Sequence, residues 1–256
     1  MTGKKIAIPT DSVSVTLLSD PMDKKDDSGE TAFYRACRDN KIDTVKQLYE
    51  DGVNWKLTNK RGRSPLWIAS REGHEEVVQF LIEVEADVSQ QDEDGNGPLH
   101  MAAQWGQLKT VKVLLSHQAD MELRNKWGST PFLFACRNGR LDVAKFLLEK
   151  GCQWNVTTNY GISPLSLASQ LGHGEVVQLL VDLGADVNQQ DEDGNRPLHA
   201  VGMWWWKNNQ EGVIRILLGK GANKDLKNND NETPLEVACR EKKYSVAEAL
   251  NPKGCK

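Results

Sequence analysis

The sequence predicts an all-α fold in which helix–turn–helix units are stacked into an elongated solenoid. The first observation is a row of glycines at a constant step of 33 residues (62 − 29, for example), at positions 29, 62, 95, 128, 161 and 194. The second is a row of prolines with the same step at 65, 98, 131, 164 and 197, then one at 234 after a step of 37. The third is that apolar residues recur at helical spacing inside each unit. A fixed period of this length indicates a repeat architecture.

Each element of the unit can be read from the stretch 161–193. Ser163 and Pro164 predict the start of an inner helix, with a hydroxyl N-cap followed by proline at the first helical position. Gly172 is expected to end that helix, because glycine tolerates the left-handed conformation. A second, outer helix follows, closed by Gly184, and the polar remainder suits a turn. Two short helices cannot bury their apolar edges alone, so each unit needs a neighbour on both sides.

At these residues the chain resembles the ankyrin repeat family. The motif G-x-S/T-P-L-x-x-A is present as Ser64-Pro65-Leu66 with Ala69, and in part as Gly97-Pro98-Leu99-His100 with Ala102. The motifs Gly-His-x-Glu-Val-Val at 172–177 and Gly-Ala-Asp-Val-Asn at 184–188 continue the match. The resemblance implies an ankyrin-repeat α-solenoid with short β-hairpin-like loops between the helix pairs, over about residues 29–250.

The chain order then predicts three parts. Residues 1–28 are expected to form a flexible N-terminal tail, and residues 251–256 a short C-terminal tail. Between them we predict seven repeats, which start near 29, 62, 95, 128, 161, 194 and 231. The first and last repeats are more polar and are interpreted as caps with one face in water. Repeat six carries four extra residues (37 − 33) between its helices.

A second period of 99 residues lies on top of the first. Residues 61–93 and 160–192 are identical at 20 of 33 positions, and the segment 90–96 recurs whole as 189–195. We infer that a block of three repeats was duplicated, so that related surfaces should recur three repeats apart. Trp55 and Trp154 are equivalent under this shift and are interpreted as packing residues.

Composition narrows the function classes. The net charge is −4 with both signs interspersed, which gives no basic surface for nucleic acid. No apolar run is long enough to predict membrane insertion. Five cysteines without a C-x-x-C pair are interpreted as reduced thiols of an intracellular protein. We therefore expect a monomer in the cytoplasm, with the nucleus as a second compartment.

No group of residues predicts chemistry, so we expect no enzyme, no cofactor and no metal. His100 and His199 in the Pro-Leu-His position, and His74 and His173 in the Gly-His position, are assigned structural roles. Cys37, Cys136 and Cys239 occupy one repeat position and are interpreted as small core residues. The acidic clusters 92–94 and 191–193 are expected at solvated hairpin tips, since calcium would need further ligands at fixed offsets.

The resemblance implies that a protein or peptide partner binds the concave face, formed by hairpin tips and inner helices. Trp105, Trp127 and Tyr160 lie on consecutive repeats and are predicted anchors, although they could instead cover neighbouring side chains. The three tryptophans 204–206 mark the insertion; either at least one is exposed to a partner, or the loop folds back and thickens the stack. The candidate partner-binding residues are Arg61, Arg63, Arg71, Trp105, Lys126, Trp127, Arg137, Tyr160, Leu171, Met203, Trp204 and Trp205.

The sequence thus predicts a non-catalytic scaffold or adaptor. The alternative is an inhibitory or regulatory subunit that masks a partner enzyme or transcription regulator. Asn188, in Asp186-Val187-Asn188 with Leu180 eight residues before it, also resembles an asparagine-hydroxylation context of the family. The other interpretation of Asn188 is that it orders the hairpin.

Overall fold

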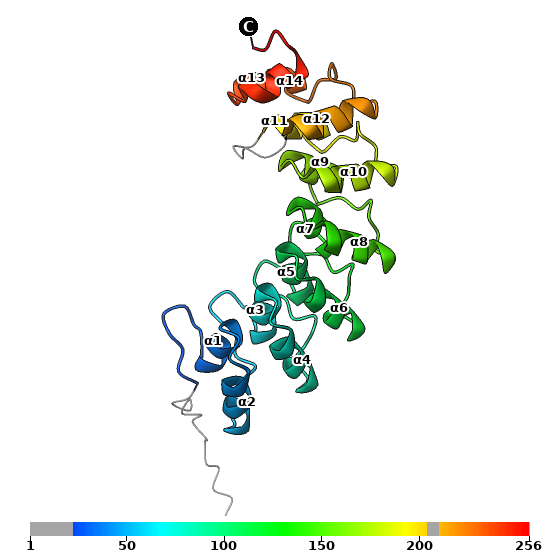
Figure 1. Cartoon of the computed structure of the whole chain (residues 1–256). Helices are drawn as coiled ribbons and strands as arrows, with labels where there is room; N and C mark the ends of the chain where they lie inside the picture. Colours follow the sequence, from blue (N-terminus) through cyan, green and yellow to red (C-terminus); the bar gives the residue numbers. More distant parts are fainter. Residues whose placement is uncertain (1–22, 204–209, 256) are drawn as a thin grey trace, which may run out of the picture.

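The computed structural model describes residues 23–203 and 210–255, which form a curved stack of antiparallel helix pairs (Figure 1). No strand is assigned within these residues, and none of their helices is long and apolar enough to cross a membrane. Seven repeats each contribute an inner helix and then an outer helix. The helices are α1 (Ala32–Arg38), α2 (Ile42–Glu50), α3 (Pro65–Glu72), α4 (Glu75–Glu83), α5 (Pro98–Trp105), α6 (Leu108–Ser116), α7 (Pro131–Arg137), α8 (Leu141–Glu149), α9 (Pro164–Gln170), α10 (Gly174–Asp182), α11 (Pro197–Gly202), α12 (Gln210–Gly219), α13 (Pro234–Arg240) and α14 (Tyr244–Leu250).

The inner helices begin where the Ser/Thr-Pro pairs predict. The Ser64 hydroxyl accepts a hydrogen bond from the Trp67 amide at 3.1 Å, and the Ser163 hydroxyl accepts one from the Ser166 amide at 3.1 Å. Proline follows each of these caps as the first helical residue. Helix α9 ends at Gln170, and Gly172 then takes a left-handed φ of +75°. The inner helices therefore begin at the predicted prolines, and α9 ends two residues before Gly172.

One continuous hydrophobic core runs through the stack. Inner helices pack against the inner helices of the next repeat, as α3 does on α5 and α5 on α7, and outer helices close the other side. The outer helices contribute a leucine at the same position in every repeat from the second to the seventh, and each is buried: Leu81, Leu114, Leu147, Leu180, Leu217 and Leu250. Burying these side chains is the main stabilising term, and it requires neighbouring repeats.

The start of the described chain is attached to repeat one. The Asp23 carboxylate accepts a hydrogen bond from the Asn54 amide at 2.9 Å, and the Lys25 ammonium donates one to the Thr58 carbonyl at 2.7 Å. Residues 23–28 of the predicted N-terminal tail therefore extend the capping repeat. Residues 1–22 lie outside the described part of the chain.

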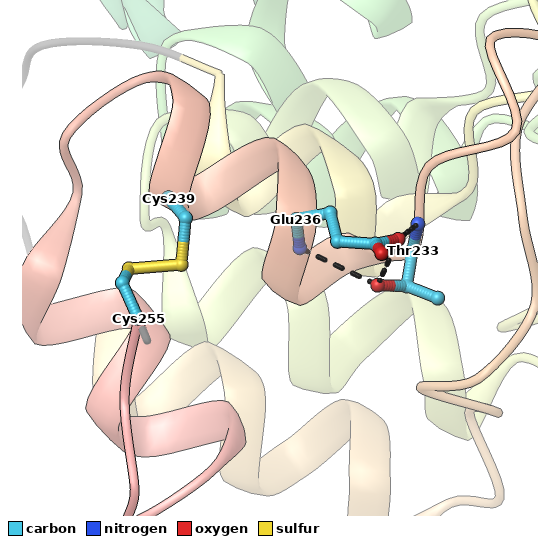
Figure 2. The surroundings of a disulfide bond; sticks show 4 residues. All are labelled: Thr233, Glu236, Cys239 and Cys255. Carbon is cyan, nitrogen blue, oxygen red and sulfur yellow. Dashed lines mark hydrogen bonds between the residues drawn. A yellow bond between two sulfur atoms is a disulfide. The ribbon is translucent and has the colours of Figure 1, made fainter.

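The prediction that all cysteines are reduced is wrong for two of them. Cys239 on α13 forms a disulfide with Cys255, as Figure 2 shows. The chain turns after α14, where the Gly254 amide donates to the Asn251 carbonyl at 2.7 Å, and returns to α13. This return could not be read from a spacing of 16 residues. Cys239 is therefore half-buried and disulfide-bonded, and it is not a small free thiol of the core.

The other three cysteines are free and buried, as Cys37, Cys136 and Cys152. Burial raises the pKa of the Cys152 thiol to about 12, and it raises the pKa values of the Cys37 and Cys136 thiols as well. Protonated thiols are poor nucleophiles, so these groups act as packing residues. The cytoplasmic location, which used the same cysteine argument, stays a prediction.

Candidate protein-binding surface

The hairpin tips that form one edge of the stack are joined by a ladder of backbone hydrogen bonds. In each step an amide of one tip donates to a carbonyl of the preceding tip, 32 residues earlier in the first five steps and 36 residues earlier in the last. The steps are Lys60 to Ser28 (3.1 Å), Glu93 to Arg61 (3.0 Å), Lys126 to Asp94 (3.1 Å), Asn159 to Trp127 (2.8 Å), Glu192 to Tyr160 (3.1 Å) and Asn229 to Asp193 (3.0 Å). The tips are therefore held in a fixed register, which preorganises any surface built on them.

Asparagine and aspartate side chains support this ladder from inside. The Asn125 side-chain oxygen accepts from the amides of Trp127 at 3.0 Å and Ser129 at 2.9 Å, and its Nδ2 donates to Asn96 Oδ1 of the preceding repeat at 2.8 Å. Asp92 plays the same part through Oδ1, which accepts from the amides of Asp94 and Asn96. Asp92 is buried, so the prediction of a wholly solvated acidic tip is wrong at this residue. An aspartate at the start of a hairpin tip can accept hydrogen bonds from backbone amides of the turn, so the place of Asp92 in the sequence indicates this role.

Three aromatic side chains lie exposed on consecutive repeats, and we call them the aromatic strip. Trp105 is 44 % exposed, Trp127 is 43 % exposed and Tyr160 is 54 % exposed. Trp105 ends inner helix α5, whereas the other two stand on neighbouring ladder tips. The guanidinium of Arg71 lies over the Trp105 ring, 4.8 Å from its centroid. Three large amphipathic rings are thus open to solvent on a rigid frame. Aromatic side chains of this size are more often covered by the rest of a protein.

Besides Arg71, the predicted basic residues divide into two groups. Arg61, Lys126 and Arg137 are exposed on tips and inner-helix ends. Arg63, in contrast, stacks over the Trp67 ring at 4.4 Å and faces the Asp92 carboxylate at 3.7 Å. Arg63 therefore belongs to the packing between repeats two and three and contributes less to the open face than the sequence suggested.

The remaining candidates are less open. Leu171 and Met203 are half-buried, and Trp204 and Trp205 lie outside the described residues. Asn188 bridges two repeats: its Nδ2 donates to the Gly221 carbonyl at 3.2 Å, and its Oδ1 accepts from the Asn223 amide at 2.9 Å. These contacts support the structural interpretation of Asn188, while its hydroxylation stays a prediction.

The histidines have the structural roles that the sequence assigned. His100 accepts from the Gly97 amide at Nδ1 (3.2 Å), and its Nε2 bonds the Ser129 carbonyl of the next repeat at 3.0 Å. His199 repeats both contacts with Arg196 and Glu232. Within residues 23–203 and 210–255, no three His, Cys, Asp or Glu side chains gather as a metal site requires.

We expect the buried histidines to make the stack less stable in mild acid. Burial lowers the pKa of His100 to about 4, and it also lowers the pKa values of His173 and His199. Between the two pKa values the unfolded chain binds more protons than the folded chain, which favours unfolding. The folded state therefore has its full stability above pH 6.5 and loses stability as the pH falls toward 4. From His100 alone, the free energy of unfolding should fall by about 1 kcal/mol between pH 7.5 and pH 5.5.

Urea unfolding followed by circular dichroism at the two pH values measures this difference. A His100→Gln variant should show a smaller pH effect than the parent. A His117→Gln variant is the control, because His117 is exposed. Stability that stays constant or rises on acidification would contradict the assignment.

Comparison with known proteins agrees with this geometry. A family model for ankyrin repeats (three copies) matches residues 9–92, 33–125, 99–191 and 165–256. The crystal structure of the human ASB11 ankyrin repeat domain superposes with a TM-score of 0.75 and 25 % identity, covering 89 % of this chain and 99 % of that one.

A curated human relative, SH3 and multiple ankyrin repeat domains protein 2, is 36 % identical over 61 residues. That match covers 24 % of this chain and 3 % of the relative, so this chain corresponds to a small part of that protein. The 33-residue period, the helix pairs and the hairpin ladder extend over the same part of the chain that the family model matches. The chain belongs to the ankyrin repeat family, whose domains are protein–protein interaction modules.

Proposed function

We propose that the chain is an adaptor that binds one protein partner across the aromatic strip, with Trp105 and Trp127 as its main anchors. The observation that carries this proposal is the exposure of Trp105, Trp127 and Tyr160 on three successive repeats joined by the hairpin ladder. Tryptophan, tyrosine and arginine are the residue types that dominate binding energy at protein interfaces. A rigid frame lowers the entropy lost when a partner docks.

The charges around the strip favour a shaped protein partner over a polyanion. Arg61 and Lys126 flank an acidic tip at Glu93 and Asp94, so positive and negative groups alternate along the same edge. Such a pattern selects a partner with the complementary alternation and repels a uniform charge. Arg71 shields one face of Trp105 and adds a cation at the end of the strip.

We expect a Trp105→Ala/Trp127→Ala double variant to bind the partner more weakly by about 2 kcal/mol or more, which is roughly 30-fold in affinity. The partner is first captured from the source cells with the unaltered chain, and its affinity for each variant is then measured by calorimetry. Tyr244→Ala is the matched control, since Tyr244 is exposed on α14 and lies outside the strip. Unchanged affinity of the double variant, with helicity preserved, would reject the strip as the anchor.

A further inference from the structure

Two small pockets in the chain are copies of one another. The first, at Trp55, has a volume of about 260 Å³, and the second, at Trp154, has a volume of about 230 Å³. Each of the nine residues that line the first pocket has its counterpart 99 residues later in the lining of the second. The pair therefore follows the duplicated three-repeat block. Neither pocket includes a residue of the aromatic strip.

The lining of the second pocket combines apolar walls with a polar edge. Trp154 comes from the segment after α8, Pro164 and Leu165 from the start of α9, and Asp186 and Gln189 from the segment after α10. A volume of this size is below that of drug-sized ligand sites and suits one long side chain. Apolar walls favour a methylene stem, while an indole ring and a carboxylate favour a cation at its tip.

In the first pocket a cation of the chain already lies over the tryptophan ring. Lys56 lines this pocket, and its ammonium lies over the Trp55 ring at 5.1 Å from the centroid. The counterpart of Lys56 in the second pocket is Asn155, which carries no charge, and the counterpart of Glu85 is Gly184. Asp186 is then the one ionisable residue among those that line the second pocket, so an arriving cation meets a carboxylate and no competing ammonium.

The carboxylate of the second pocket is also held in place. Asp186 Oδ1 accepts a hydrogen bond from the Asn188 amide at 2.8 Å, and a carboxylate has capacity for further donors. Among natural cations, a guanidinium can both stack on an indole ring and donate several hydrogen bonds to a carboxylate, which an ammonium does less well.

We propose that the Trp154 pocket binds the arginine side chain of a partner peptide, and that the Lys56 ammonium over the Trp55 ring competes with the same ligand at the equivalent pocket. The duplicated block has thus given two copies of one site, and in the Trp55 copy the chain's own cation already lies over the indole ring. This inference does not depend on the aromatic strip, and a Trp105→Ala/Trp127→Ala variant should retain the arginine site.

The test uses the full chain, labelled with nitrogen-15, and the indole N–H signals of its tryptophans in nuclear magnetic resonance spectra. Trp154→Phe and Trp55→Phe variants assign the two signals. N-acetylarginine amide is titrated against N-acetylcitrulline amide, which has nearly the same shape without the charge. We expect arginine to shift the Trp154 signal with an affinity about tenfold higher than that of citrulline.

Exchanging the two natural residues gives the matched controls. Asn155→Lys should weaken arginine binding at Trp154 by about tenfold, and Lys56→Asn should make the Trp55 signal respond to arginine. Asp186→Asn, which can keep the hydrogen bond to the Asn188 amide, should weaken binding as well. Equal responses to arginine and citrulline, or a Trp154 response unchanged by Asn155→Lys in a variant of native helicity, would overturn the proposal.

Discussion

Replacing Leu147 by alanine is expected to lower the free energy of unfolding by about 3 to 5 kcal/mol. Leu147 is completely buried in α8, at the position that Leu114 and Leu180 fill in the adjacent repeats. Truncation removes apolar contacts and leaves a cavity between neighbouring helix pairs. A loss of this size is a large part of the stability of a typical domain.

Urea unfolding of the parent and the variant, followed by circular dichroism, measures the difference. Leu183→Ala is the matched control: the same chemical change at an exposed residue should cost less than about 1 kcal/mol. A decrease in the slope of the Leu147→Ala transition would indicate that the stack now unfolds in two parts, because repeats communicate only through their neighbours. Equal losses for Leu147→Ala and Leu183→Ala would contradict a core shared along the stack.

The sequence predicts the helix pairs and their stacking well, because local signals that recur in each repeat determine them. Ser64 with Pro65, and Gly73 at the end of α3, determine helix ends through contacts within a few residues. The leucine position of the outer helices recurs at every repeat, so its burial follows once stacking is assumed. Residues that act at long range are harder to predict, and Cys255 reaches Cys239 only because the chain reverses after α14.

The candidate surface was predicted less completely. The exposure of Trp105 and Trp127 follows from their place at an inner-helix end and a hairpin tip, which the family resemblance implies. Whether a basic residue is free depends on its neighbours in the next repeat, and Arg63 packs on Trp67 and Asp92 instead. The paired pockets could be anticipated only as a recurrence of related surfaces three repeats apart. The two pockets differ in sequence at Lys56 and Glu85, but the position of the Lys56 ammonium over the Trp55 ring is visible only in the structure.

Replacing Gly95 by alanine is expected to cost about 3 kcal/mol, which is more than the same change costs at Gly151. Both glycines have a left-handed φ, of +82° and +85°, so both variants carry the backbone strain of a side chain in that region. A Cβ at Gly95 would also lie 2.9 Å from the Lys126 amide nitrogen and 3.1 Å from the Asn125 Cα. At Gly151 nothing lies within 4 Å of that Cβ, so about 1 kcal/mol of strain is the whole expected cost.

The chain itself contains a natural version of this comparison. Gly95 occupies the ladder position that is glycine in the first six repeats, whereas the seventh repeat has Asn231 there, with a φ of +64°. Among the described residues, no ladder bond joins the tip of Asn231 to a later hairpin. Glycine is therefore needed at the other tips because the next hairpin approaches closely, in addition to the left-handed backbone.

The same pair of variants connects the ladder to binding. The clash at Gly95 falls on the Lys126 amide, which donates the 3.1 Å ladder bond to Asp94 and immediately precedes Trp127 of the aromatic strip. We therefore expect Gly95→Ala to weaken partner binding as well as stability, whereas Gly151→Ala should leave affinity unchanged. Urea unfolding and calorimetry on both variants provide the measurement. Two glycines with nearly equal φ but different neighbours should differ in stability and in affinity. Equal losses would show that backbone strain alone sets the cost of the substitution.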